Sequence, residues 1–292
     1  MIPLLLTMQQ AQEADSAPWL NFNSGDIVVR QKPASCKISL DPELKVDHYE
    51  MTGEPATVEY NSRGSRLYGR SVSFDVKQQA ASVFVLSSAD VTGDARVTTD
   101  TAIEAEYARS IGKPIEIPIA SRSDLRTDSL TVRTIATVQT LTLPTSFVFR
   151  ASREARSPSR DAPVPFDESD LIEGAGGTLN TALAQATGTY QIATGSIDGP
   201  VHYHMERTER PPGEKAFKRN TYDLMADRIV FDFSKPEGSV SAIGHVRYSL
   251  TGDRNLQSRA DRVDMFTDAD HKVSKLIAYS SKTTIPAKEV HP

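Results

Sequence analysis

The chain has 292 residues, a formal net charge of −5 and a sequence isoelectric point of about 5.7. Apolar residues make up 38% of it, which favours thin, one-sided sheets over a thick α/β core. An acidic chain without a basic cluster argues against nucleic acid as a ligand, and a single cysteine, Cys36, excludes an intramolecular disulfide and a cysteine-based zinc site.

Residues 1–18 are predicted to be a leader or the remnant of a signal peptide. Their apolar core is too short to span a membrane, and no Lys or Arg precedes it. An unstructured N-terminal tail explains the same residues equally well. No other segment of the sequence is long and apolar enough for a transmembrane helix.

Residues 19–150 are predicted to form an N-terminal β block. Within it, residues 58–97 have the pattern of hairpins, and residues 71–76 are apolar at every second position. Residues 102–108 fit either a short helix or an extended segment. Residues 130–149 fit two strands or one long bulged strand.

Residues 151–178 are polar and contain prolines, which predicts a linker and the domain boundary. A C-terminal β block is predicted over 179–292. Its residues 240–250 alternate between apolar and polar side chains, and turn residues occur at 235–238, 251–255 and 268–272. The charged stretch 207–219 is predicted to be a long loop.

A short pattern is repeated in the chain. Residues 226–229 (Ala-Asp-Arg-Ile) recur 34 positions later as residues 260–263 (Ala-Asp-Arg-Val), and residues 69–72 (Gly-Arg-Ser-Val) are a looser copy. A period of 34 also occurs in helical repeats. The local period of two around these copies indicates β-strands instead. Repeated β units bury their apolar faces by stacking.

Catalytic motifs are scarce, and no catalytic residue is predicted. His202 and His204 are two apart on a predicted strand, so both imidazoles would share one face, and Glu209 follows. This resembles the first metal-binding motif of cupins, although Ser241 stands where the second motif would supply a His. The alternative is that both histidines belong to the polar face of an ordinary alternating strand.

The apolar faces of the strands are the other candidate site. The sequence offers no long amphipathic helix to cover a broad sheet, so another sheet, or the same sheet folded over, must cover it. A groove left between two such faces would suit acyl chains, because each buried methylene contributes about 0.8 kcal/mol. The groove-lining residues predicted from the alternation are Val72, Phe74, Val76, Ile229, Phe231, Val246 and Val263.

Three short motifs occur in order along the chain. Residues 51–58 contain a Gly-x-Pro-Ala pattern, residues 224–229 contain Leu-x-Ala-Asp-Arg, and residues 242–246 read Ala-Ile-Gly-His-Val. Together these motifs resemble those of the LptA/OstA-like family of periplasmic lipopolysaccharide-transport proteins, in which the last is the partner strand of the second. The resemblance covers about residues 50–97 and 220–285. It implies an all-β fold, a twisted open antiparallel jelly roll of taco-like form, here in two stacked blocks.

The resemblance also implies a function. It predicts a non-enzymatic protein without a cofactor that binds lipopolysaccharide or a related lipid and moves it across the periplasm for outer-membrane assembly. The implied partners are other jelly-roll transport proteins, or a second copy of this chain, joined end to end through edge strands. The implied location is the periplasm, with outer-membrane association as an option. A cupin-like metalloenzyme and a structural β-assembly module are the alternatives.

Overall fold

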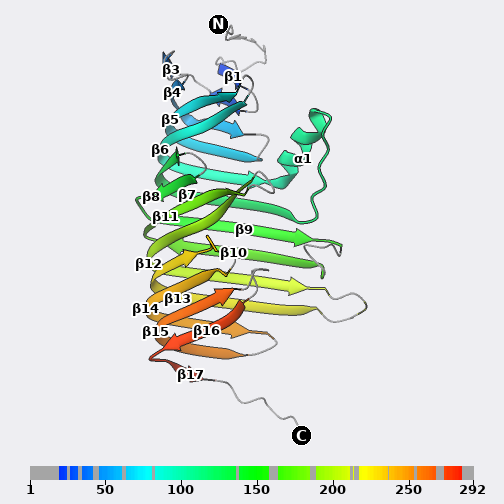
Figure 1. Cartoon of the computed structure of the whole chain (residues 1–292), viewed down its shortest axis with the longest axis vertical. Coiled ribbons are helices and arrows are strands. Elements are labelled where there is room, and N and C mark those ends of the chain that lie inside the picture. The colour runs from blue at the N-terminus through cyan, green and yellow to red at the C-terminus, as the bar shows by residue number, and fades with distance from the viewer. Residues whose placement is uncertain are drawn as a thin grey trace. The chain divides into compact units, whose positions relative to one another are not determined.

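The computed structural model describes residues 20–24, 27–31, 35–41, 46–60, 64–80, 83–135, 138–157, 164–184, 189–210, 213, 217–235, 237–252, 255–267 and 273–284. Antiparallel strands dominate these residues, with a single helix among them, so the all-β prediction is confirmed (Figure 1). Two compact units are present. The first comprises residues 1–117 and 122–143, and the second comprises residues 118–121 and 144–292.

The strands of the first unit pair mostly in chain order. The long strand β4 pairs with both β2 and β3 along one edge and with β5 along the other, and β5, β6, β7 and β8 follow in sequence. The bounds are β1 Leu20–Ser24, β2 Ile27–Gln31, β3 Ser35–Asp41, β4 Val46–Tyr60, β5 Ser65–Ala80, β6 Val83–Asp100, β7 Ala120–Ile135 and β8 Val138–Leu143.

The second unit has the same kind of arrangement. The long strand β12 pairs with β10 and β11 along one edge and with β13 along the other, and β15 ends against β16 and β17. The bounds are β9 Phe147–Ala155, β10 Phe166–Gly174, β11 Gly176–Ala184, β12 Thr189–Glu209, β13 Lys218–Asp232, β14 Ser239–Thr251, β15 Leu256–Thr267, β16 Val273–Tyr279 and β17 Lys282–Thr284.

The prediction of a linker at residues 151–178 is wrong. It contains the end of β9, all of β10 and the start of β11, and the two compact units divide after Leu143 instead. The charged side chains there misled the prediction because they pair across strands. Glu168 on β10, for example, stands opposite Arg153 on β9 in the ladder.

Other predicted elements need smaller changes. Residues 102–108, which fit either a helix or an extended segment, form a helix, α1 (Thr101–Ser110). Asp100 caps its N-terminus, because the Asp100 carboxylate accepts a hydrogen bond from the Ala102 amide. Residues 130–149 hold three strand segments rather than two, and the loop predicted at 207–219 shrinks because β12 runs to Glu209. The predicted leader 1–18 and the turn 268–272 lie outside the described residues.

The repeated pattern marks a shift in strand register. On β13, Met225 pairs with Arg247 of β14, but Arg228 pairs with Ile243, so two residues of β13 face three of β14. Ala226 and Ile229 are both buried although they are three positions apart. A regular strand would place them on opposite faces. The shift therefore keeps the apolar side chains on one face while the strand bends, as at a β-bulge.

Four strands share this shift, which we call the corner. The first and fourth residues of the pattern are buried in all four, at 69–72, 127–130, 226–229 and 260–263. The copy at 127–130 (Thr-Asp-Ser-Leu) is not recognisable from the sequence, because only its Asp and its final apolar residue match the pattern Ala-Asp-Arg-Ile. The neighbouring strands β4, β6, β12 and β14 carry the extra residues, at 53–55, 93–94, 199–200 and 244–245.

Glycine and an ion pair complete two of the corners. Gly244 has a φ of +75°, and a Cβ there would come within 2.3 Å of the Asp227 carboxylate. The same carboxylate contacts the imidazole of His245 at 2.7 Å. In the first unit, the guanidinium of Arg70 contacts the carboxylate of Asp94 at 2.5 Å at the equivalent place. The two corners thus use the same pairing with the charges exchanged between strands.

A Gly244→Ala variant should therefore lose more stability than a matched change elsewhere. We expect the free energy of unfolding to fall by about 3 kcal/mol, because the positive φ is strained and Asp227 must move away from His245. Gly213→Ala is the control, since its φ is +81° but nothing lies within 4 Å of the new Cβ. That change should cost about 1 kcal/mol. Equal losses in urea unfolding would contradict the role of the corner.

Candidate functional site

The inner face of the first unit is apolar and closely packed. Val72, Phe74 and Val76 follow one another along β5 and have fractional exposures of 0, 0 and 1%. The ring of Phe74 stacks on that of Tyr49 from β4, with 4.8 Å between the centroids. Burial of these side chains removes apolar surface from water and stabilises the pairing of β4 with β5.

The inner face of the second unit is apolar in the same way. Ile229 and Phe231 on β13, Val246 on β14 and Val263 on β15 have fractional exposures between 1 and 9%. The structure thus places all seven residues predicted to line a groove on buried inner faces. Their contact with a lipid stays a prediction.

The inner face of the second unit also has a charged end. The side chain of Glu168 on β10 is only 2% exposed and accepts hydrogen bonds from Arg153 of β9 and, at 3.0 Å, from Arg207 of β12. The guanidinium of Arg207 also lies 4.2 Å from the centre of the buried Phe166 ring. Two cations therefore hold one buried carboxylate against an aromatic ring.

Asp170 and Tyr203 lie next to this charged end. The hydroxyl of Tyr203 donates to the carboxylate of Asp170 at 3.0 Å. Burial, followed by the charge of Glu168, raises the pKa of Asp170. Burial and the charge of Asp170 raise the pKa of Tyr203, so the phenol is a neutral donor at physiological pH. Asp170 also shares its face of β10 with Glu168, since the two are two positions apart.

The inner face of the second unit is thus amphipathic along its strands. Val201 and Ala226, beside the corner, are buried and apolar, whereas Glu168 and Arg207 lie towards the other end of the same paired strands. Arg153 is 52% exposed, so its guanidinium can contact an anionic group in addition to Glu168. The linker predicted at 151–178 would contain none of these contacts, so that prediction conceals the cluster. The alternation of Phe166, Glu168 and Asp170 was the available signal.

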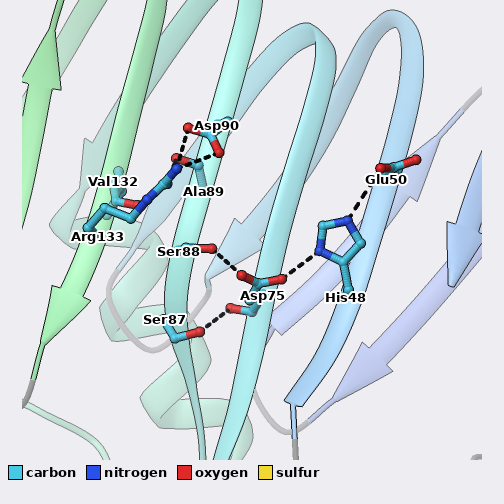
Figure 2. Close-up of polar contacts among 9 residues, drawn as sticks. All are labelled: His48, Glu50, Asp75, Ser87, Ser88, Ala89, Asp90, Val132 and Arg133. Atoms are coloured by element: carbon cyan, nitrogen blue, oxygen red, sulfur yellow. Dashed lines mark hydrogen bonds and ion pairs between the residues drawn. The ribbon is translucent and has the colours of Figure 1, made fainter. Parts of the chain in front are cut away.

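The outer face of the first unit is a ladder of polar contacts (Figure 2). The imidazole of His48 contacts the carboxylate of Asp75 at 2.6 Å, and Ser88 donates to the same carboxylate at 2.5 Å. The hydrogen bond to Asp75 raises the pKa of His48. Further along β6, the guanidinium of Arg133 contacts the carboxylate of Asp90 at 2.7 Å. These pairs cover the outer face with neutralised charge.

His202 and His204, the histidines of the cupin-like alternative, belong to a similar ladder in the second unit. One carboxylate oxygen of Asp223 contacts His202 Nε2 at 3.3 Å and His204 Nδ1 at 2.9 Å. The hydrogen bond to Asp223 raises the pKa of His204. Burial opposes ionisation of Asp223, but the hydrogen bonds from His204 and His202 outweigh it and lower its pKa. The alternating-strand interpretation of His202 and His204 accounts for these contacts.

The structure does not bring Glu209 to these histidines. Glu209 lies five positions after His204 on an unbroken stretch of β12, so its side chain lies on the opposite face. Its carboxylate accepts a hydrogen bond from Arg207 at 2.9 Å. Among the described residues, no group of three or more His, Cys, Asp or Glu side chains is arranged to hold a metal ion. The cupin-like alternative thus lacks its carboxylate on the face of the two histidines.

Comparison with protein-family models, with curated proteins and with solved structures gave no match for this chain. Within the described part of the chain, no helix is long and apolar enough to cross a membrane.

Removing the charge of Glu168 should destabilise the second unit. We expect Glu168→Gln to lower the free energy of unfolding by about 2 kcal/mol, because Arg153 and Arg207 lose the carboxylate that neutralises them. Glu154→Gln on the neighbouring strand is the control, because the pair of Glu154 with Arg156 is exposed and its loss should not be measurable. Equal effects of the two substitutions on urea unfolding would contradict a special role for Glu168.

The contact between His204 and Asp223 should make stability depend on pH. The folded-state pKa of His204 lies above its ordinary value of 6.5, so folding favours the protonated imidazole. This contribution is fully present below about pH 6.5 and is lost as the pH rises through the raised folded-state value. The difference in unfolding midpoint between the wild type and His204→Asn should therefore be largest near pH 5 and shrink towards pH 8. A difference that does not change with pH would contradict this origin.

Proposed function

We propose that this protein is a non-enzymatic lipid-binding protein of the LptA/OstA-like kind, with each unit a twisted open jelly roll of taco-like form. The observation that carries the proposal is the corner. Within each unit it keeps apolar side chains on one face on both sides of the register shift, as with Val72 on β5 in the first unit and Val263 on β15 in the second. A sheet that keeps its apolar face across a β-bulge, where the strand bends, is suited to enclose acyl chains.

The energetics of such a ligand follow from the inner faces. The seven candidate side chains are buried within their own units, so an acyl chain enters a unit by parting packed apolar surfaces and replacing their contacts with its own. Each methylene that leaves water contributes about 0.8 kcal/mol, and the side chains lose no apolar partner in the exchange. Arg153, half exposed at the charged end of the second unit, would pair with an anionic head group.

Transport is the corresponding role in the cell. We propose lipopolysaccharide or a related lipid as the cargo, the periplasm as the compartment and outer-membrane assembly as the destination. Pairing of edge strands with another jelly-roll protein, or with a second copy of this chain, would extend the apolar path. The support for this part is the resemblance of residues 50–97 and 220–285 to the LptA/OstA-like family.

Site-specific photocrosslinking tests the proposal. A benzoylphenylalanine at Phe74, which is fully buried on the inner face, should form a lipid adduct when the purified protein is irradiated with lipopolysaccharide. The same group at Lys77, three residues further along β5 and exposed, is the matched control and should form none. Adducts would be detected by mass spectrometry.

A second inner position guards against a variant that misfolds. Benzoylphenylalanine at Phe231 probes the second unit in the same way, and circular dichroism reports whether each variant keeps its β structure. The proposal would be contradicted if folded protein formed no adduct at either inner position. It would also be contradicted if the exposed position Lys77 formed as much adduct as the inner positions.

A further inference from the structure

A row of outward-facing side chains crosses the second unit just before the corner. The register of four strands aligns Met225 of β13 with Arg247 of β14, Arg259 of β15 and Lys282 of β17. All four side chains are exposed. Neighbouring strands in a sheet lie about 4.8 Å apart, so three cationic residues occupy three consecutive strands of one row.

A second outward row lies just after the corner. It aligns Arg228 of β13 with Ile243 of β14, Arg262 of β15 and Tyr279 of β16. Here the cations have acidic partners. Arg228 contacts Asp198 at 3.3 Å, and Arg262 contacts Asp264 at 2.7 Å. The second row thus adds exposed apolar side chains and little free charge.

The cations of the first row lack such partners. Neither Arg247 nor Arg259 forms an ion pair with any residue that the structure describes, and the two stand directly opposite each other. Like charges placed opposite each other across a strand pair destabilise the sheet. Folding does not account for this arrangement, whereas an external anion at the row would neutralise it.

Apolar side chains flank the unpaired cations. Met225, Ile243 and Tyr279 are 49, 37 and 45% exposed, and the Arg262 guanidinium lies 5.7 Å from the centre of the Tyr279 ring. Between the two rows, at the corner itself, are Asp227, which contacts His245, and the exposed Asp261. The surface therefore combines unpaired cations with exposed apolar and aromatic side chains.

We infer that this two-row surface docks the protein on an anionic phospholipid membrane. Arginine and lysine attract the lipid phosphates, while Met225, Ile243 and Tyr279 suit the boundary between head groups and acyl chains. Single-stranded nucleic acid is the weaker match, because it needs a longer basic track and aromatic rings on which successive bases stack. The inference concerns the outer face and goes beyond the proposed lipid cargo of the inner face.

Co-flotation with vesicles tests this docking. The full chain should bind vesicles of phosphatidylcholine containing one third phosphatidylglycerol and should not bind pure phosphatidylcholine. The double substitution Arg247→Gln/Arg259→Gln should weaken binding roughly 30-fold, at about fivefold for each cation near an anionic surface. Raising sodium chloride from 0.1 to 1 M shortens the screening length from about 10 to about 3 Å and should release the wild type.

A charge-matched control separates the row from overall charge. Arg126→Gln/Arg133→Gln removes the same charge from the first unit, where both arginines contact carboxylates, and should leave binding within about twofold of the wild type. Met225→Ser/Ile243→Ser should weaken binding as well. Equal loss in both arginine pairs, salt-resistant binding, or no binding to anionic vesicles would overturn the inference. Tighter binding to a labelled oligonucleotide than to vesicles would also overturn it.

Measurements of stability and of crosslinking distinguish a loss of docking from misfolding and from failure of the proposed lipid cargo. Because Arg247 and Arg259 repel each other, their joint replacement should raise the unfolding temperature slightly, so weakened docking would not reflect misfolding. The double variant should still form the lipid adduct at Phe74. Lost docking with a retained adduct supports both proposals, whereas docking without any adduct leaves the outer-face inference standing and removes the proposed cargo.

Discussion

The register shift at the corner is the constraint on which the rest of this structure depends. Side chains on a β-strand alternate between two faces, so an apolar set whose spacing changes from even to odd partway along a regular strand would be divided between both faces. Here one strand of each pair carries extra residues at the bend, which restores the apolar set to the inner face. Ala226 and Ile229 are both buried for this reason. The burial of Phe74 and Phe231 follows from the same device in each unit.

The inner and outer faces handle charge differently. On the outer face, carboxylates meet histidine or arginine across neighbouring strands, as Asp75 meets His48 and Asp223 meets His204, and each pair stays accessible to water. Such exposed pairs contribute little stability but neutralise the surface. On the inner face, Glu168 is buried and needs two arginines, because a single unpaired carboxylate there would be strongly destabilising. A buried charge beside an apolar face is suited to an amphiphilic ligand.

The unpaired cations of the outer face stand apart from this pattern. Arg247 and Arg259 face each other across β14 and β15, whereas the nearby Arg228 and Arg262 have acidic partners. Overall composition conceals this local excess, because the chain as a whole carries a formal charge of −5. An acidic protein can therefore present a basic surface to a membrane, provided that the sheet register gathers the cations.

The sequence by itself determined the β class and the inner residues, because apolar alternation with period two is a local property that survives folding. It also located the repeated pattern at 226–229 and 260–263. Only the tertiary structure decided what that pattern does, since a register shift depends on the partner strand. The same reason explains two errors. The charged residues of 151–178 predict a linker because their cross-strand partners are not evident from the sequence. Glu209 cannot share a metal site with His204, because an odd spacing places the two side chains on opposite faces of the strand. The row from Met225 to Lys282 draws one residue from each of four strands, so strand pairing alone assembled it.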